Sequence, residues 1–291
     1  MKVLIITDLE GVNGVLNFDD WCVPEGRRNE AGCRFLTEEV NAAVAGFFEA
    51  GADSVTVADG HGSGGSIRGE LLDPRAALQR GIKISPIFND DCDVAAFIGQ
   101  HAKAGTANAH LAHTQTEEAV DFRINGVSVG EFGQLSYAFY ERGIPVIFAS
   151  GDLALTHEAT GLIAGIFTVP VKEGFNPALD ASCPAGEIMA RQSAALHYPR
   201  SKVLSEIRRQ SYCALQKYHQ DKTAFAIKPL SAPYQIEAEY RETAPRLVPI
   251  TGKLPARRIT TSWHDTTAAA FCEFYGELEW GTPEGEHYEL L

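Results

Sequence analysis

The sequence lacks several features that would each indicate a different class of protein. Basic residues are in deficit: 25 Lys and Arg stand against 38 Asp and Glu, which gives a formal net charge of -13. Nucleic acids and anionic membrane surfaces bind basic patches, so this balance excludes both as partners. No apolar run approaches the roughly 20 residues of a membrane span, and the apolar start of the chain is too short for a secretory signal. We therefore expect a soluble, cytoplasmic protein.

Paired cysteines and repeated segments are missing as well. The six cysteines are scattered without a CxxC spacing, which in a cytosolic chain indicates free and mostly buried thiols rather than a cysteine metal site. The sequence contains no internal repeat and no low-complexity tract. A chain of 291 residues can bury one large core together with a smaller neighbour.

What the sequence does contain is an alternation of strand-like and helix-like segments. Strands are expected from continuous apolar runs and helices from apolar positions three and four residues apart. The expected strands are 2–7, 54–59, 94–99, 145–150 and 166–171, and the expected helices are 30–50, 134–142 and 153–164. Asn125-Gly126 between two short alternating runs predicts a hairpin. These patterns predict a three-layer α/β domain with a mostly parallel, mixed sheet.

The last third of the chain has a different pattern. A loop rich in Gly and Pro is expected at 172–187. It precedes three strand-like runs, at 224–230, 234–240 and 257–263, and one helical run, at 266–278. We therefore predict a metal-binding α/β domain over 1–198 and a smaller α+β domain over 199–291, with the boundary somewhere within 172–222.

The first strand ends in two acidic residues, Asp8 and Glu10. Alternate side chains of a strand share a side, so these carboxylates would lie roughly 7 Å apart at ~3.3 Å per residue. Ligands of open α/β sheets bind at the carboxyl ends of strands, and two neighbouring carboxylates repel unless a cation lies between them. Alternatively, Asp8 caps a turn and Glu10 is solvated.

Other expected strands end in similar residues. His61 follows the second strand, His101 follows the third, and Glu131 follows the hairpin. Four strand ends would thus bring these residues, with Asp8 and Glu10, to one edge of one sheet. Three carboxylates and two imidazoles suit zinc, manganese or cobalt, and one carboxylate can bridge two ions. The set therefore predicts a metal site.

Further polar residues near these strand ends have several interpretations. His113 could act as a general acid or base, whereas His110 is expected at the surface. Asp59 is expected to hold a ligand histidine, although it could instead cap a turn. Lys103 could face a substrate carboxylate or an oxyanion, or be solvated. Asp152 is explained by N-capping of a helix.

Several of these segments resemble motifs of one family. They match in order and spacing the motifs of the D-aminopeptidase DppA family, the M55 metallopeptidases. The matching segments are "DLEG" (8–11), "DGHG" (59–62), "GQHAKAGT" (99–106), "AHT" (112–114) and "GEFG" (130–133). The resemblance continues through "VPVKEG" (169–174) and is much weaker beyond it. One departure is Ile6, which occupies the serine position of the family signature S-x-D-x-E-G.

The resemblance implies an activity and a site. Five residues would hold a pair of zinc ions, namely Asp8, Glu10, His61, His101 and Glu131. His113 would be the catalytic histidine, which in the family is proposed as the nucleophile. A ring-like, decameric homo-oligomer is also implied.

The residues and the resemblance together favour metal-assisted hydrolysis of short peptides, with an N-terminal D-amino acid implied by the family. Zinc is the expected cofactor, with manganese or cobalt as alternatives. Two other functions stay open: a two-metal phosphoesterase or amidohydrolase that uses the same ligands, and a non-catalytic protein that binds metal or peptide.

Overall fold

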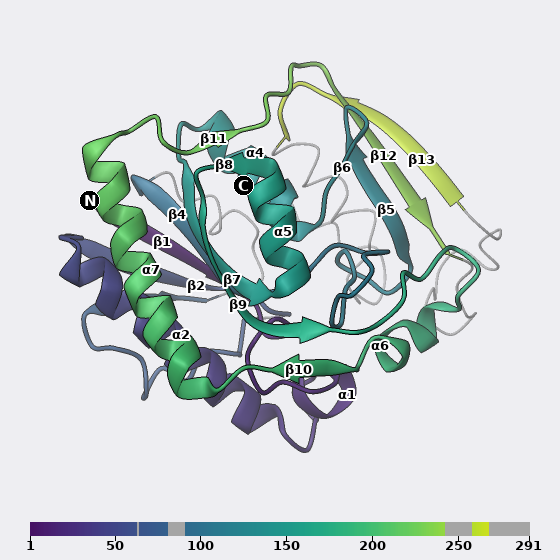
Figure 1. The fold of residues 1–291 in the computed structure, drawn as a ribbon. Coiled ribbons are helices and arrows are strands. Elements are labelled where there is room, and N and C mark those ends of the chain that lie inside the picture. Colours follow the sequence, from purple (N-terminus) through teal and green to yellow (C-terminus); the bar gives the residue numbers. More distant parts are fainter. Residues whose placement is uncertain (63, 81–90, 242–257, 268–291) are drawn as a thin grey trace.

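The computed structural model describes residues 1–62, 64–80, 91–241 and 258–267, and a seven-stranded sheet forms its centre (Figure 1). In spatial order the strands are β10 (Ala195–His197), β9 (Phe167–Gly174), β7 (Val146–Asp152), β4 (Val94–Gln100), β1 (Lys2–Thr7), β2 (Ser54–Asp59) and β3 (Ala76–Gln79). All neighbouring strands are parallel except β9 and β10. The predicted mostly parallel, mixed sheet is therefore confirmed.

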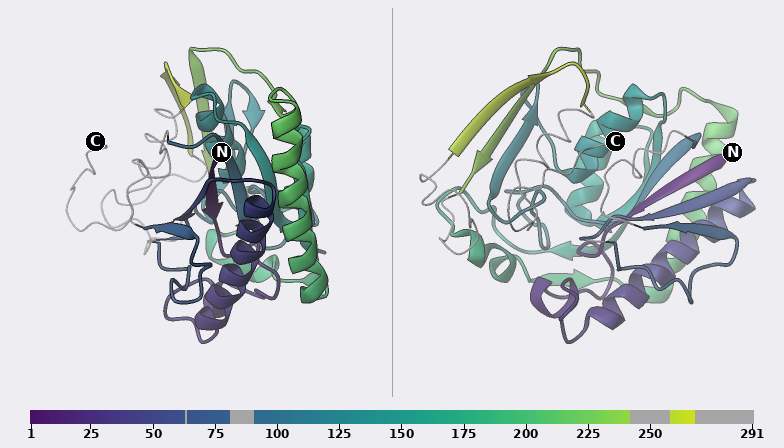
Figure 2. Two further views of the ribbon diagram at one scale, coloured as in Figure 1. Left: turned by 90° about the vertical axis from the view of Figure 1, so that its left-hand side faces the viewer. Right: turned by 180° about the vertical axis from the view of Figure 1, so that it is seen from behind.

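Helices pack against this sheet, and the two longest also pack side by side against each other (Figure 2). These two are α2 (Asn29–Glu49) and α7 (Arg200–Gln220), and the other helices on the sheet are α4 (Glu131–Glu141) and α5 (Leu153–Leu162). Short helical turns occur in the connections: α1 (Phe18–Trp21), η1 (Ala185–Glu187) and α6 (Ile188–Arg191).

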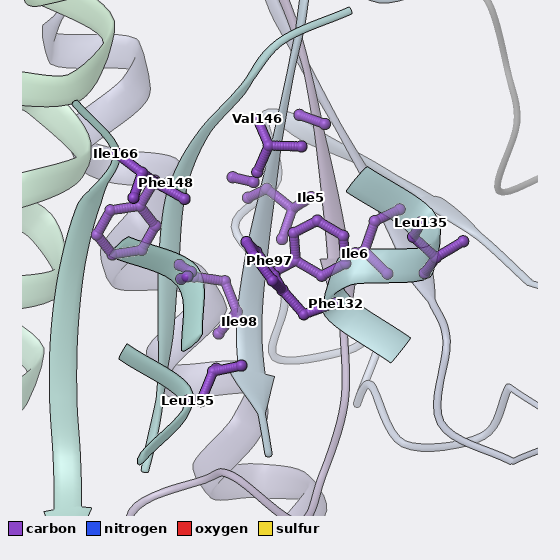
Figure 3. Packing of buried hydrophobic residues seen from close by; sticks show 14 of the residues in the cluster. Ile5, Ile6, Phe97, Ile98, Phe132, Leu135, Val146, Phe148, Leu155 and Ile166 are labelled. Atoms are coloured by element: carbon purple, nitrogen blue, oxygen red, sulfur yellow. The ribbon is translucent and has the colours of Figure 1, made fainter. Parts of the chain in front are cut away.

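Two central strands show that helices cover both faces of the sheet. Phe148 of β7 pairs with Ala96 of β4, so both point to one face, and Phe97, the next residue of β4, points to the other. Phe148 packs edge-on against Phe47 of α2, with ring centroids 6.4 Å apart. Phe97 packs against Phe132 of α4 at 5.0 Å (Figure 3). The sheet thus lies between two helical layers, and continuous apolar strands such as β4 are buried on both sides.

A second, antiparallel sheet lies at the far end of the molecule from α7 (Figure 1). Its strands, in spatial order, are β13 (Arg258–His264), β12 (Tyr234–Tyr240), β5 (Ala119–Ile124) and β6 (Val127–Ser128). The predicted hairpin joins β5 to β6 through Asn125 and Gly126, which both have positive φ. A two-stranded ribbon of β8 (Ile163–Ala164) and β11 (Ala226–Ile227) completes the strands.

The division predicted at residue 198 stays a prediction. Strand β12, which follows it in sequence, pairs with β5, which precedes it, and α7 packs on α2 of the main layer. The helix predicted for 266–278 lies almost wholly outside the described residues. The five cysteines within the described part of the chain are free, and three of them are buried. None of the described helices is long and apolar enough to cross a membrane.

Candidate metal centre

The turn after β1 brings Asp8 and Glu10 together. The strand ends one residue before Asp8, so the turn rather than strand alternation sets the direction of both carboxylates. The N–H of Gly11 donates to the carbonyl of Gly99 at 2.8 Å, which fixes the turn against the end of β4. A Cβ at Gly11 would lie 2.0 Å from the carbonyl oxygen of Gln100, so only glycine permits this close approach.

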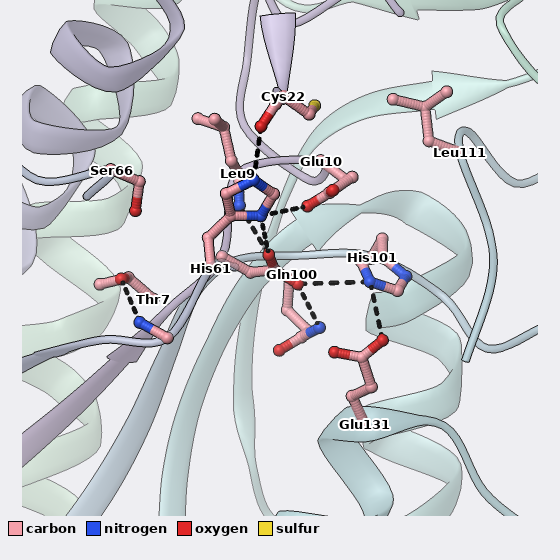
Figure 4. A network of polar contacts seen from close by, with 12 residues as sticks. Thr7, Leu9, Glu10, Cys22, His61, Ser66, Gln100, His101, Leu111 and Glu131 are labelled. Carbon is pink, nitrogen blue, oxygen red and sulfur yellow. Dashed lines mark hydrogen bonds and ion pairs between the residues drawn. The ribbon is translucent and has the colours of Figure 1, made fainter. Parts of the chain in front are cut away.

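His61 faces both carboxylates of this turn with one ring nitrogen. Its Nδ1 lies 3.0 Å from Oδ1 of Asp8 and 3.1 Å from Oε2 of Glu10 (Figure 4). Its Nε2 lies 2.7 Å from the carbonyl oxygen of Cys22, which can only accept a hydrogen bond. Nε2 therefore carries the proton of the neutral ring, and the lone pair of Nδ1 points at the carboxylates.

His101 directly follows β4 and also faces a backbone carbonyl with one ring nitrogen and carboxylates with the other. The roles of Nδ1 and Nε2 are the reverse of those in His61. Its Nδ1 donates to the carbonyl of Ala102 at 3.0 Å. Its Nε2 lies 3.3 Å from Oδ2 of Asp8 and 3.4 Å from Oε1 of Glu131, and Figure 4 marks the contact between His101 and Glu131 with a dashed line. This buried nitrogen has no hydrogen-bond partner among the described residues, and a metal ion is one partner that it could take.

Asp8 lies between the two imidazoles. Its Oδ1 faces His61 and its Oδ2 faces His101, and the side chain of Gln100 donates to Oδ2 at 2.8 Å. Oε2 of Glu10 is a second buried atom that makes no hydrogen bond within the described chain. Asp8 and Glu10 therefore both offer carboxylate oxygens that could hold a metal ion.

Glu131 reaches the site from a helix rather than from the main sheet. It is the first residue of α4, which follows β6 of the second sheet. The expectation that all five residues come from strand ends of one sheet is therefore wrong for Glu131. The first turn of a helix favours negative charge, and Oε1 accepts a hydrogen bond from the N–H of Gln115 at 2.7 Å.

His113 lies beside these residues. Its ring stacks on that of His101, with centroids 3.9 Å apart and planes 11° from parallel. Nδ1 donates to the carbonyl of Leu111 at 2.9 Å, and Nε2 lies 3.8 Å from Oε1 of Glu131. Burial, together with the charge of His101, lowers the pKa of His113. The neutral ring therefore has its lone pair on Nε2.

The charges of the site favour a cation. Burial opposes the ionised form of Asp8, but hydrogen bonds and charge from His101 and His61 outweigh it and hold the pKa of Asp8 well below its usual range. Burial also opposes the charged imidazoles, yet the carboxylates, led by Glu10 at His61 and Glu131 at His101, raise both pKa values well above the usual range. A divalent cation would meet the same demand for positive charge.

Within the described parts of the chain, the potential ligand atoms form two groups, and the atoms of each group lie no more than 4.8 Å apart. One group consists of Asp8, Glu10 and His61, and the other consists of His101, His113 and Glu131. The structure thus brings together all six residues predicted for the site. It also makes His113 a potential ligand as well as a potential catalytic group.

Comparison with known proteins identifies the family. The sequence model of peptidase family M55, described as D-aminopeptidase, matches residues 1–272. The chain belongs to the D-aminopeptidase family. The D-aminopeptidase of Bacillus subtilis (strain 168) is 32% identical over 212 residues, which cover 70% of this chain and 76% of that protein. The predicted family and the predicted peptide-bond hydrolase are therefore confirmed.

A solved structure shares the fold. It is described as "Zn-dependent D-aminopeptidase DppA from Bacillus subtilis, a self-compartmentalizing protease" and superposes with a TM-score of 0.77 at 24% identity. The match covers 98% of this chain and all of that one. The α/β architecture is thus that of a solved D-aminopeptidase.

Two neighbours of the site in this D-aminopeptidase family member have roles other than those favoured from sequence. The hydrogen bonds of the Asp59 carboxylate do not go to His61 in the described structure: it accepts from the N–H groups of Ser66 at 3.2 Å and Ile67 at 2.9 Å. Asp59 therefore orders the loop that carries His61. This role corresponds to the alternative interpretation of the sequence, in which Asp59 caps a turn. The ammonium of Lys103 donates to the carbonyl of Ser128 at 3.3 Å and so binds β6.

His110 corrects another expectation. It is 0% exposed rather than at the surface. Its backbone N–H donates to Asp152 at 3.0 Å, and its Nε2 lies 3.1 Å from the carbonyl of Leu16. The carboxylate of Asp152 also accepts from the N–H of Leu155 at 3.1 Å, so the predicted N-cap of α5 is confirmed.

Lys172 of β9 is a buried cation that sequence reasoning missed. It is 0% exposed, and its ammonium donates to the carbonyls of Glu10 and Val15. It therefore holds the turn that carries two of the candidate ligands. The signal was a lysine that directly follows the apolar residues of β9, within the strand.

Proposed function

We propose that the protein is a zinc-dependent aminopeptidase that removes an N-terminal D-amino acid from short peptides at a dinuclear site. Two imidazoles carry this proposal. His61 and His101 each donate one ring N–H to a backbone carbonyl and turn the other nitrogen toward carboxylates. Family membership and the zinc dependence named for the solved relative support it.

The donor atoms fit two ions that share Asp8. Asp8, Glu10 and His61 would hold one ion, and Asp8, His101 and Glu131 would hold the other. Carboxylates and neutral imidazoles suit zinc, with manganese and cobalt as alternatives. Bound ions would polarise the scissile carbonyl and anchor the free amino group of the peptide.

We assign His113 the catalytic role. The hydrogen bond from Nδ1 to Leu111 leaves the lone pair of Nε2 available, so this nitrogen can take a proton or attack the peptide carbonyl. We expect His113→Ala to keep both ions and to lose turnover of D-Ala-D-Ala by about 10²–10⁴-fold. A variant of the exposed His157, His157→Ala, is the matched control. Loss of zinc from His113→Ala would instead identify His113 as a ligand.

We infer the substrate preference and the assembly of this protein from the descriptions of its relatives. The name D-aminopeptidase supports a D-residue at the N-terminus, and the description self-compartmentalizing supports a homo-oligomer, which we propose is a ring of ten chains. Release of D-alanine from D-Ala-D-Ala, compared with L-Ala-L-Ala, tests the first inference. Light-scattering mass in solution tests the second.

The decisive experiment measures metal per chain. Elemental analysis of the purified protein should find about two zinc ions, and Glu10→Ala should lose at least one of them. The control is Glu206→Ala, because Glu206 belongs to neither candidate ligand group and pairs at the surface with Arg209 of the same helix. Absence of zinc from the unmodified protein after incubation with zinc would overturn the proposal. Turnover of a phosphodiester without release of D-alanine would favour a two-metal phosphoesterase.

A further inference from the structure

We propose that Glu158 of α5 is a positioning residue for the half of the site formed by His101 and Glu131; this inference rests on the proposed function. Glu158 belongs to neither candidate ligand group. Its two carboxylate oxygens accept hydrogen bonds from two separate segments: Oε2 from the N–H of Lys103 at 3.0 Å and Oε1 from the N–H of Gly130 at 3.2 Å. One carboxylate thus joins the segment that follows His101 to the segment that precedes Glu131.

The first of these hydrogen bonds acts on His101 through a single peptide group. The N–H of Lys103 and the carbonyl of Ala102 belong to the same planar unit. That carbonyl accepts the hydrogen bond from Nδ1 of His101 at 3.0 Å. By holding the N–H, Glu158 fixes the direction of the carbonyl and, through it, the tautomer and orientation of the imidazole.

An anionic acceptor also polarises the peptide group, which strengthens the hydrogen bond at its other end. Metal-binding histidines commonly donate their second N–H to a carboxylate. Here the carboxylate of Glu158 acts on His101 through one peptide group instead of directly.

The second hydrogen bond acts on Glu131. Gly130 is the N-cap residue of α4 and has no side chain to cap the helix, so the carboxylate of Glu158 supplies negative charge there. A Cβ at Gly130 would lie 2.7 Å from Cβ of Lys103 and 3.2 Å from Oε1 of Glu158. The two segments therefore touch without spare room. The hydrogen bonds of Glu158 hold these two segments in contact, and this contact sets the distance between His101 and Glu131.

Glu158→Gln tests this role, because an amide offers only one oxygen and leaves one of the two N–H groups facing an NH₂ group. Zinc affinities are measured by competition with chelators of known strength, starting from the metal-free full-length protein. We expect the affinity for one of two zinc ions to fall by about 10–100-fold and the affinity for the other to stay within about twofold of the original. Glu206→Gln, on the surface of α7, should leave both affinities unchanged.

The outcomes separate this inference from the proposed function. If the unmodified protein binds no zinc, the proposed function fails first. If it binds two ions and Glu158→Gln binds both with unchanged affinity, only the positioning role is overturned. Equal weakening of both ions would show a general structural effect and would also overturn it.

A second variant applies if Glu158→Gln does not fold. Gly130→Ala keeps the carboxylate but forces the Lys103 segment away, since its Cβ would lie 2.7 Å from Cβ of that residue. The same selective loss of one ion is expected, and retention of both ions at unchanged affinity would overturn the inference. Thermal unfolding of each metal-free variant shows whether it is folded.

Discussion

Replacement of the buried His110 by Gln should remove part of the acid sensitivity of the fold. His110 is 0% exposed, and burial, reinforced by the charge of Lys172, lowers its pKa from 6.5 to about 2. The unfolded chain therefore takes up a proton as the pH falls below about 6.5, whereas the folded protein does not. A depressed pKa means that stability is present above pH 6.5 and is lost progressively as the pH falls from 6.5 toward 2.

The magnitude follows from the two pKa values. At pH 5 the unfolded imidazole is almost fully protonated and the folded one is neutral. The free energy of unfolding is therefore lower by about 1.36 kcal/mol for each of the roughly 1.5 pH units below 6.5, or about 2 kcal/mol. This value hardly depends on the folded pKa, because any folded pKa below about 4 leaves the imidazole neutral at pH 5.

Urea unfolding at pH 7.5 and pH 5.0 checks this prediction, with all proteins metal-free so that the candidate ligands titrate alike. The amide of His110→Gln can still donate to the carbonyl of Leu16, which His110 contacts at 3.1 Å. We expect the free energy of unfolding of the original protein to fall between the two pH values by about 2 kcal/mol more than that of the variant. The exposed His157 provides the control, and His157→Gln should behave like the original. Equal falls in the original protein and in His110→Gln would refute the reasoning.

Four further substitutions, of which Gly143→Ala serves as a comparison for Gly99→Ala, test the fold by urea unfolding. Gly99 and Gly143 both have φ near +75°, but a Cβ at Gly99 would lie 2.2 Å from the carbonyl oxygen of Asp8, whereas Gly143 has open space. Gly99→Ala should therefore cost more than about 3 kcal/mol and Gly143→Ala only about 1, and similar costs would contradict the steric argument. Phe97→Ala, at a fully buried ring, should cost about 3–5 kcal/mol, and a cost below about 1 would show that the core refills the cavity. Lys172→Met should cost about 2–5 kcal/mol, because two buried carbonyls lose their donor, and an unchanged midpoint would show that neither carbonyl needs the ammonium.

Sequence patterns were most informative where the site depends on the main sheet. Asp8, His61 and His101 follow apolar runs that form β1, β2 and β4, and parallel neighbouring strands bring their carboxyl ends to one edge. Glu131 lies beside His101, as expected, but the expected element is wrong, because the helix begins three residues before the expected position and follows a strand of the second sheet. Local periodicity does not reveal which sheet a short strand joins.

Residues whose role depends on contacts between distant loops could not be predicted. His110 lies in a loop, yet its ring meets residues far away in the sequence: the carbonyl of Leu16, 94 residues earlier, and the ring of His197, whose centroid is 5.9 Å away. The sequence favours a contact of Asp59 with a histidine over the capping of a turn, and only the path of the loop through Ser66 and Ile67 shows that the turn is capped. Glu158 acts on backbone N–H groups, which every non-proline residue supplies, so its partners leave no trace in the sequence.

The three imidazoles of the site are all oriented by backbone carbonyls: His61 by Cys22, His101 by Ala102 and His113 by Leu111. A carbonyl can only accept, so each contact fixes which ring nitrogen carries the proton. Among the described residues no side chain accepts these N–H groups directly, and the carboxylates of Asp8, Glu10 and Glu131 stay directed toward the other ring nitrogens. The arrangement requires an unusual backbone instead. Leu111 has φ +54°, a conformation that costs about 1–3 kcal/mol outside glycine and that the surrounding packing must hold in place.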